Sequence, residues 1–213
     1  MHPAYRAAVS LLVPPRCAVC ATPCATSATI CAACDRRLAA AGPGSTELAG
    51  VGRVFWAAPY DGAARELIAA LKFAGRLALA DRAAAAILAA LPAGLDAAAV
   101  VPVPPAPLRL RRRGFDPAHE IATQVADRLG VPLEPVLRRK GGPRQVGRSR
   151  TDRLRSLPEV WTTRRLPRPA LLVDDVLTTG ATLRACVSAL GTRVDAAVFA
   201  RALGTEAISA YHG

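Results

Sequence analysis

The segment LLVDDVLTTGATL, residues 171–183, places two adjacent carboxylates at the end of an apolar run. Asp174 and Asp175 can accept hydrogen bonds from the vicinal hydroxyls of a ribose or hold Mg²⁺ through water. The loop after them offers hydroxyls and unhindered N–H groups at a helix N-terminus, which suits a phosphate. The alternative is a strand–turn–helix whose aspartates only cap and solvate. We expect a site for a ribose with a phosphate on one end, with these loop residues: Thr178, Thr179, Gly180, Ala181 and Thr182.

Four cysteines form two CxxC pairs with ten residues between them. Two such pairs supply four thiolates for a tetrahedral Zn²⁺, although a redox dithiol is the alternative for either pair. The expected ligands are Cys17, Cys20, Cys31 and Cys34. Cys24 lies between the pairs and is open as a replacement ligand, whereas Cys186 falls in an apolar helical pattern and is expected to be buried.

Positive charge is concentrated in one central segment. Of 28 Lys and Arg and 16 Asp and Glu in the chain, residues 109–168 hold 16 and 6, a net charge of +10 against +2 elsewhere. A segment of this kind favours phosphate, either on a small ligand or along a nucleic acid.

The elements that must position these residues alternate between strands and helices. Strands are expected at residues 52–60, 97–104, 170–175 and 193–203, with a weak one near 134–139. Helices are expected at 64–73, 78–91 and 182–190, and at 116–130 with Asp116 as N-cap and Gly130 past the end. Residues 38–50 resemble a linker, and Trp56 and Trp161 are expected in the core, although Trp161 is also placed to stack a base.

This alternation predicts an α/β fold with a parallel sheet. Ligands bind such sheets beyond the carboxyl ends of the strands, so Asp174, the turn after residues 97–103 and the basic loop 141–156 are expected on one rim. The 213 residues suffice for one core and an appendage, and the 52% hydrophobic content excludes a disordered chain. The sequence shows no membrane span, and we expect a cytoplasmic protein.

Residues 173–182 resemble the signature that binds 5-phosphoribosyl 1-pyrophosphate (PRPP) in type I phosphoribosyltransferases. The whole chain resembles the competence protein F family, which joins a four-cysteine zinc module to that fold. In the family the usual asparagine after Arg-Gly-Phe is Asp116 here, and a later one is Ser156. The motifs shared with the family are the cysteine pairs, Tyr60, Leu71-Lys72-Phe73, Val-Pro-Val-Pro at 101–104, Arg-Gly-Phe at 113–115, and Gln145, Arg150 and Arg153.

The resemblance implies a zinc module with its linker at residues 1–50 and a Rossmann-like phosphoribosyltransferase domain at 51–213. It implies that the paired acids hold the ribose hydroxyls and that the loop holds the 5-phosphate. Arg113, Arg150 and Arg153 would act on the pyrophosphate together with Mg²⁺, with the loop at 145–153 closing as a lid. Lys72 is equally compatible with ligand binding and with extending into solvent.

Three functions follow from the resemblance. The first is transfer of the phosphoribosyl group to a nitrogen acceptor, although Thr178 stands where purine-salvage relatives often have a base-contacting aspartate. The second is an accessory role in the uptake of single-stranded DNA, through binding of nucleic acid, a competence helicase or another DNA-processing protein. The third is a regulator that binds PRPP without turnover.

Overall fold

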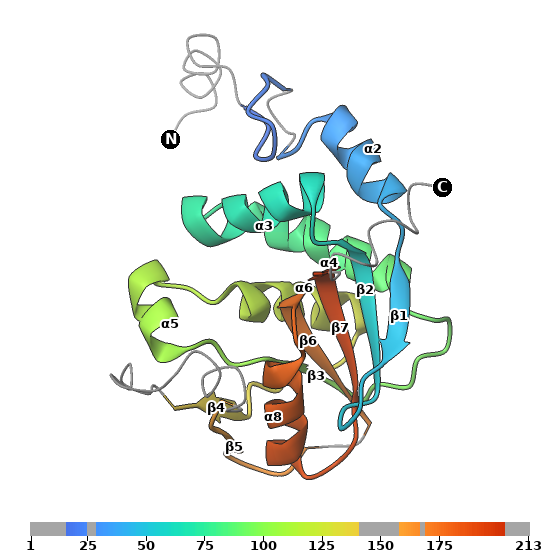
Figure 1. Ribbon diagram of the computed structural model, residues 1–213, viewed down its shortest axis with the longest axis vertical. Helices are drawn as coiled ribbons and strands as arrows, with labels where there is room; N and C mark the ends of the chain where they lie inside the picture. Colours follow the sequence, from blue (N-terminus) through green and yellow to red (C-terminus); the bar gives the residue numbers. More distant parts are fainter. Residues whose placement is uncertain (1–15, 25–28, 141–157, 167–168, 203–213) are drawn as a thin grey trace.

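The computed structural model describes residues 16–24, 29–140, 158–166 and 169–202. Its helices are α2 (Ala32–Ala40), α3 (Gly62–Ala74), α4 (Ala78–Ala90), α5 (Pro107–Arg113), α6 (Pro117–Leu129) and α8 (Ala181–Leu190). Its strands are β1 (Gly44–Glu47), β2 (Arg53–Pro59), β3 (Ala99–Pro102), β4 (Leu137–Arg139), β5 (Val160–Thr162), β6 (Ala170–Leu177) and β7 (Asp195–Arg201). In Figure 1 the cysteine segment and α2 lie beyond α3, at the end of the molecule away from α8.

A five-stranded sheet in the order β1-β2-β7-β6-β3 forms the centre of the molecule. The four strands β2, β7, β6 and β3 run parallel, and β1 pairs antiparallel with β2. The chain is therefore mixed α/β with a mostly parallel sheet, as its alternating pattern predicts. Strands β3 and β6 are parallel neighbours, with Pro102 opposite Val173. Their carboxyl ends therefore lie side by side at the same edge of the sheet.

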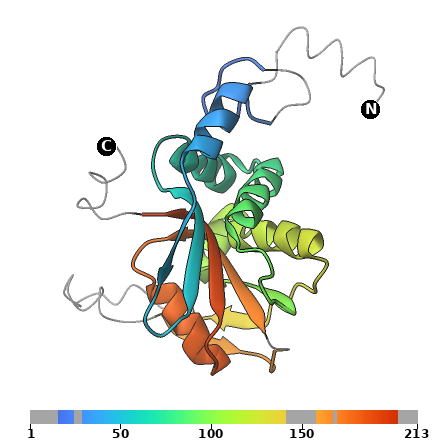
Figure 2. The ribbon, with the colours of Figure 1, turned by 90° about the vertical axis from the view of Figure 1, so that its right-hand side faces the viewer.

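Each face of the sheet has its own apolar core. Helices α3, α4 and α6 cover one face, where Leu171, Val173 and Phe199 are buried. Helix α8 and strand β4 cover the other, where Leu172 and Val198 are buried. Figure 2 shows α4 and α6, in green and yellow-green, on one side of the sheet and α8, in orange-red, on the other. Both faces of β6 are covered, which explains its continuous apolar run.

Helix boundaries near the pocket follow local chemistry. The Asp116 side chain accepts a hydrogen bond from the Ala118 N–H at 3.2 Å and caps α6, and Gly130 ends it in the left-handed conformation at φ 68°. Both assignments confirm the sequence prediction. Helix α8 starts after Gly180, at φ 73°.

The segment expected as a linker contains structure. Helix α2 continues to Ala40 and β1 adds an edge strand, in which Gly44 lies opposite Trp56. A Cβ at Gly44 would lie 2.4 Å from Cζ2 of Trp56, so the glycine is needed for close packing. The segment GPGS has the composition of a turn, so the sequence does not indicate a strand there. Gly44 is present because the Trp56 side chain of β2 leaves no room for a Cβ.

Three further expectations differ from the structure. Strand β6 continues to Leu177, two residues beyond its predicted end at Asp175, because Leu177 still pairs with Arg201 of β7. The weak strand near 134–139 becomes β4 of a separate antiparallel pair with β5 rather than a strand of the main sheet. Trp161 lies on β5 with an exposed fraction of 46%, outside the core.

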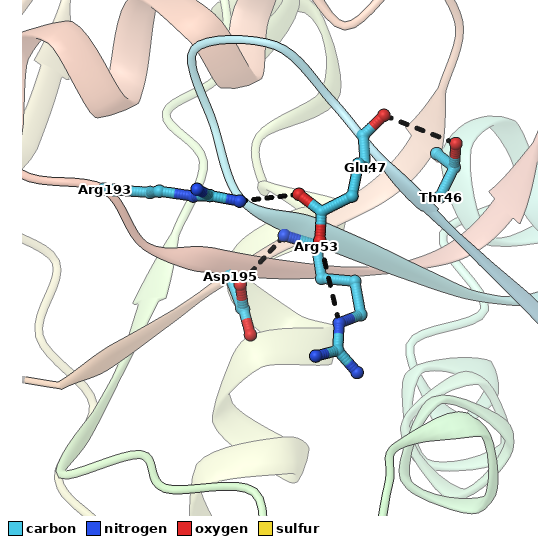
Figure 3. A network of polar contacts seen from close by, with 5 residues as sticks. All are labelled: Thr46, Glu47, Arg53, Arg193 and Asp195. Carbon is cyan, nitrogen blue, oxygen red and sulfur yellow. Dashed lines mark hydrogen bonds and ion pairs between the residues drawn. The ribbon is translucent and has the colours of Figure 1, made fainter.

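Polar contacts join the strands at the rim where β2 and β7 begin, opposite the rim that holds Asp174. Glu47 of β1 accepts from Arg193 at 2.6 Å, and Asp195 accepts from the backbone N–H of Arg53 at 2.8 Å (Figure 3). Within the described residues, no helix is long and apolar enough to cross a membrane.

Candidate functional site: a pocket at the carboxyl ends of β3 and β6

A pocket of about 290 Å³ lies where β3 and β6 end. Of the residues predicted from the sequence, the structure brings Asp174, Asp175, Thr178, Thr182 and Arg113 onto its wall. Thr179 and Gly180 lie in the adjoining loop and Ala181 is the first residue of α8, and none of the three lies on the wall. Arg150 and Arg153, with Gln145 and the expected lid, fall outside the described residues. The remaining wall residues are Tyr60, Lys72, Val103, Pro104, Pro105, Ala106, Arg109, Asp116, Pro117, Ala118, Arg139 and Val176.

The two aspartates face different surroundings because neighbouring residues of a strand point to opposite faces of the sheet. Asp175 forms an ion pair with Lys72 of α3, with 2.7 Å between Oδ2 and Nζ. Asp174 accepts from the Asp175 backbone N–H at 2.8 Å. Burial and the neighbouring Asp175 charge raise the pKa of Asp174 well above its usual range. Asp174 is therefore the carboxylate whose negative charge is less well balanced.

Lys72 is a wall residue rather than a solvent-exposed lysine. Its side chain is 17% exposed, and that of its partner Asp175 is 13% exposed. The sequence left ligand binding and solvent exposure as equal alternatives for Lys72. The position of Lys72 at the end of the apolar face of α3 could have indicated that it lies on the wall. This face packs against the sheet, so a residue at its end lies near the rim of the sheet.

The loop between β6 and α8 is held in position at its glycine. Gly180 has a φ of 73°, and a Cβ there would lie 2.6 Å from Cδ2 of Leu48. The Ala181 N–H donates to the Thr179 hydroxyl at 3.4 Å, and Arg184 donates to the Thr179 carbonyl at 2.7 Å. Thr178 and Thr182 remain on the pocket wall with their hydroxyls available to a ligand.

Basic side chains meet the pocket from two directions. Helix α5, which the sequence analysis did not predict, contributes Arg109 and Arg113. Strand β4 contributes Arg139, whose pKa is lowered chiefly by burial and also by the nearby charge of Arg109. Arg139 was not predicted from the sequence. The signal that could have identified it is a basic residue at the end of a short strand within the positive segment.

Asp116 is a third carboxylate of this pocket. Besides capping α6, it lies on the wall with Asp174 and Asp175. Burial raises the pKa of Asp116 to about 6, and the charge of Asp175 adds to this effect. From the sequence, Asp116 was predicted only as a helix cap and as a departure from the family pattern, not as a pocket residue.

The four cysteines of the two CxxC pairs converge on one point. The Sγ atoms of Cys17, Cys20, Cys31 and Cys34 all lie within 4.8 Å of one another. The Sγ atoms of Cys20 and Cys31 are 3.7 Å apart. Four sulfurs bound tetrahedrally to Zn²⁺ at 2.3 Å would be about 3.8 Å apart, so the cluster has the size of a metal site. These four thiols could hold a metal ion such as zinc.

The backbone around the cluster also suits thiolates. The Sγ of Cys17 accepts from the N–H groups of Val19 at 3.4 Å and of Cys31 at 3.3 Å. Cys31 is the N-cap of α2, so the second pair lies at the positive end of a helix dipole. Hydrogen bonds with Thr22 lower the pKa of Cys20 to about 6, whereas burial raises the pKa of Cys34. A bound cation would keep all four deprotonated together.

No protein-family model matches this chain, and no curated protein is significantly similar to it. Its function must therefore be argued from the geometry of these two sites.

Proposed function

We propose that the pocket binds PRPP together with Mg²⁺. The observation that carries this proposal is the lining of a pocket of about 290 Å³, on which Asp174 and Asp175 meet two threonines and three arginines. The acids suit the ribose hydroxyls, the loop suits the 5-phosphate, and the arginines suit the pyrophosphate. PRPP carries its ribose hydroxyls between two phosphate groups. It therefore suits a pocket in which acidic side chains for the hydroxyls lie next to basic side chains for the phosphates.

The donor set also fits a magnesium ion. The raised pKa of Asp174 reflects burial and the adjacent Asp175, and a divalent cation near the pair would relieve both penalties. Asp174 and Asp175 are the residues that would hold it, directly or through water. Mg²⁺ would supply positive charge to neutralise the phosphate oxygens.

Transfer of the phosphoribosyl group to a nitrogen acceptor extends this proposal. A bond forms between the acceptor nitrogen and C1 of the ribose, the bond from C1 to the pyrophosphate oxygen breaks, and pyrophosphate leaves with that electron pair. Arg109, Arg113 and Arg139 are placed to stabilise the charge that develops on the leaving group. The chain would then be a phosphoribosyltransferase of the kind that its resemblance to the competence protein F family implies.

A second candidate is an accessory protein that binds single-stranded DNA or a DNA-processing partner. It is favoured by α5, on which Arg109, Arg111 and Arg112 are exposed and form no ion pair with another described residue. Exposed arginines of this kind bind phosphates with a strong dependence on salt. Such binding would survive replacement of the two aspartates, which separates it from the first candidate.

The test of the first candidate is calorimetric titration with PRPP and Mg²⁺. We expect Asp174→Asn combined with Asp175→Asn to weaken PRPP binding by at least about 100-fold, because both acceptors for the ribose hydroxyls lose their charge. The fold should persist. Removal of the buried charge of Asp174 is stabilising, and it partly offsets the loss of the ion pair between Asp175 and Lys72.

Asp96→Asn combined with Asp127→Asn is the matched control, because it removes two exposed carboxylates that lie outside the pocket. This control should bind PRPP as the parent does. Unchanged PRPP affinity in the Asp174 and Asp175 variant would refute the site, and absence of binding in the parent would refute the ligand.

A further inference from the structure

A second hollow adjoins the pocket between the end of α3 and helix α5. Its volume is about 710 Å³. The two helices lie on the same side of the molecule in Figure 1. The walls of the hollow and of the first pocket share four residues: Tyr60, Lys72, Arg109 and Arg113. Its other wall residues are Phe73, Gly75, Arg112 and Phe115.

Aromatic rings form much of this wall. Phe73 is 79% exposed, although Leu71, two residues earlier on α3, is fully buried. Phe115 is partly buried and packs against the main core. The Arg113 guanidinium lies over the Phe73 ring at 5.3 Å from its centroid, so a charged group and an aromatic ring already meet in this hollow. An exposed phenylalanine at the rim of a hollow offers a stacking surface to a planar ligand.

The charge of the hollow is positive. Arg109, Arg112 and Arg113 line it, and no described carboxylate does, in contrast to the first pocket with its three aspartates. Lys72 is already paired with Asp175, so the three arginines account for the charge that a ligand would meet. Arginines beside aromatic rings bind an anionic group and stack on a flat ring at the same time.

We propose that this hollow binds a second ligand, a planar aromatic ring that carries an anionic group, next to the PRPP pocket. The shared wall would place this ligand beside the phosphoribosyl group, so its position deepens the proposed function, but its binding does not depend on PRPP. The anionic group is a carboxylate or a phosphate, and the probes below distinguish these two sources.

The experiment is calorimetric titration of the full chain, at physiological salt and without PRPP. One probe is pyridine-2,3-dicarboxylate and the other is thymidine 5′-monophosphate. The first control, pyridine-2,3-dicarboxamide, keeps the ring without the charge. The second, cis-cyclohexane-1,2-dicarboxylate, keeps the charge without the flat ring. We expect at least one probe to bind at least about tenfold more tightly than both controls, because ring and charge each contribute.

Two variants locate this binding. Phe73→Ala and Arg112→Gln should each weaken it by about tenfold, since each removes one surface that the ligand contacts. Leu108→Ala and Arg111→Gln are matched controls, because both are exposed on α5 and neither lines the hollow. Affinity for PRPP should stay unchanged in Arg112→Gln, because Arg112 does not line the first pocket.

These results separate the failure of this proposal from failure of the proposed function. If PRPP does not bind but a probe does, only the proposed function fails. The second-ligand proposal is overturned if neither probe binds, if Phe73→Ala and Arg112→Gln leave probe binding unchanged, or if the saturated dicarboxylate binds equally well. If both probes fail and affinity for oligodeoxythymidine rises steadily with length, the hollow is instead part of a surface that binds nucleic acid.

Discussion

Asp174 and Asp175 are adjacent in sequence but differ in how their charges are balanced. The Nζ atom of Lys72 lies 2.7 Å from Oδ2 of Asp175, whereas Asp174 forms no ion pair with another described residue. Burial and Asp175 together raise the pKa of Asp174. We infer that a cation or ribose hydroxyls would act chiefly on Asp174, whereas Asp175 exchanges part of its interaction with Lys72 for the ligand.

The raised pKa of Asp116 predicts a dependence of stability on pH. Its pKa in the folded chain is about 6, above the value of 3.8 for a free side chain. The folded state therefore binds this proton more tightly than the unfolded state, and the associated stability is lost as pH rises from about 4 through 6. Asp116→Asn removes that loss and keeps a good helix cap. Between pH 4.5 and 7.5, its gain in unfolding free energy over the parent should grow by about 2 kcal/mol.

Urea denaturation of both proteins at several pH values, without ligand, measures this difference. Asp116→Ala is the control, because it removes the charge together with the hydrogen bond to the Ala118 N–H. It should be less stable than Asp116→Asn by about 1 kcal/mol at every pH. A difference between Asp116→Asn and the parent that does not change with pH would contradict the raised pKa.

At the scale of elements, the sequence predicts those whose own pattern carries the information. Helices α3, α6 and α8 have apolar faces with clear ends, and β6 and β7 have long apolar runs. The acidic pair, its loop and the cysteine pairs also follow from spacing alone. Helix α5 has no buried residue, β1 is an edge strand of four residues, and β4 has three residues and pairs with β5, so local periodicity does not reveal them. Arg139 of β4 was missed for the same reason.

Strand β1 provides a test of an element that the sequence analysis mistook for a linker. Trp56 packs between Gly44 of β1 and the guanidinium of Arg201, which lies 4.4 Å from the ring centroid. Gly44→Ala would place a Cβ against the indole, and we expect the unfolding free energy to fall by about 1–3 kcal/mol. Ser45→Ala, at the next and exposed position, should change it by less than about 0.5 kcal/mol. Equal effects in urea denaturation would show that β1 does not pack closely on Trp56.

At the scale of the whole molecule, the cysteine module and the sheet share a core. Leu38 of α2 is 5% exposed and belongs to the core beneath α3 and α4, and Val19 and Ile30 pack against it. Asp35 of α2 also pairs with Arg82 of α4 at 2.5 Å. The division at residue 50 therefore describes a change of composition, while packing and the β1–β2 pair continue across it.

Removal of the metal tests how far this continuity extends. A zinc-loaded chain treated with a strong chelator at neutral pH should lose backbone protection in residues 16–24 and 29–40, because four thiols without an ion do not hold two separated loops together. Strands β2, β6 and β7 should stay protected, since their cores contain few residues of the module. Loss of packing at Leu38 should lower the thermal midpoint by about 5 °C. Hydrogen exchange with mass spectrometry measures both regions in one experiment.

Cys24→Ser should still bind one zinc ion per chain, and Cys20→Ser should bind it much more weakly. Simultaneous loss of protection in the central strands would show that the metal stabilises the whole fold, and retained zinc affinity in Cys20→Ser would refute the ligand set.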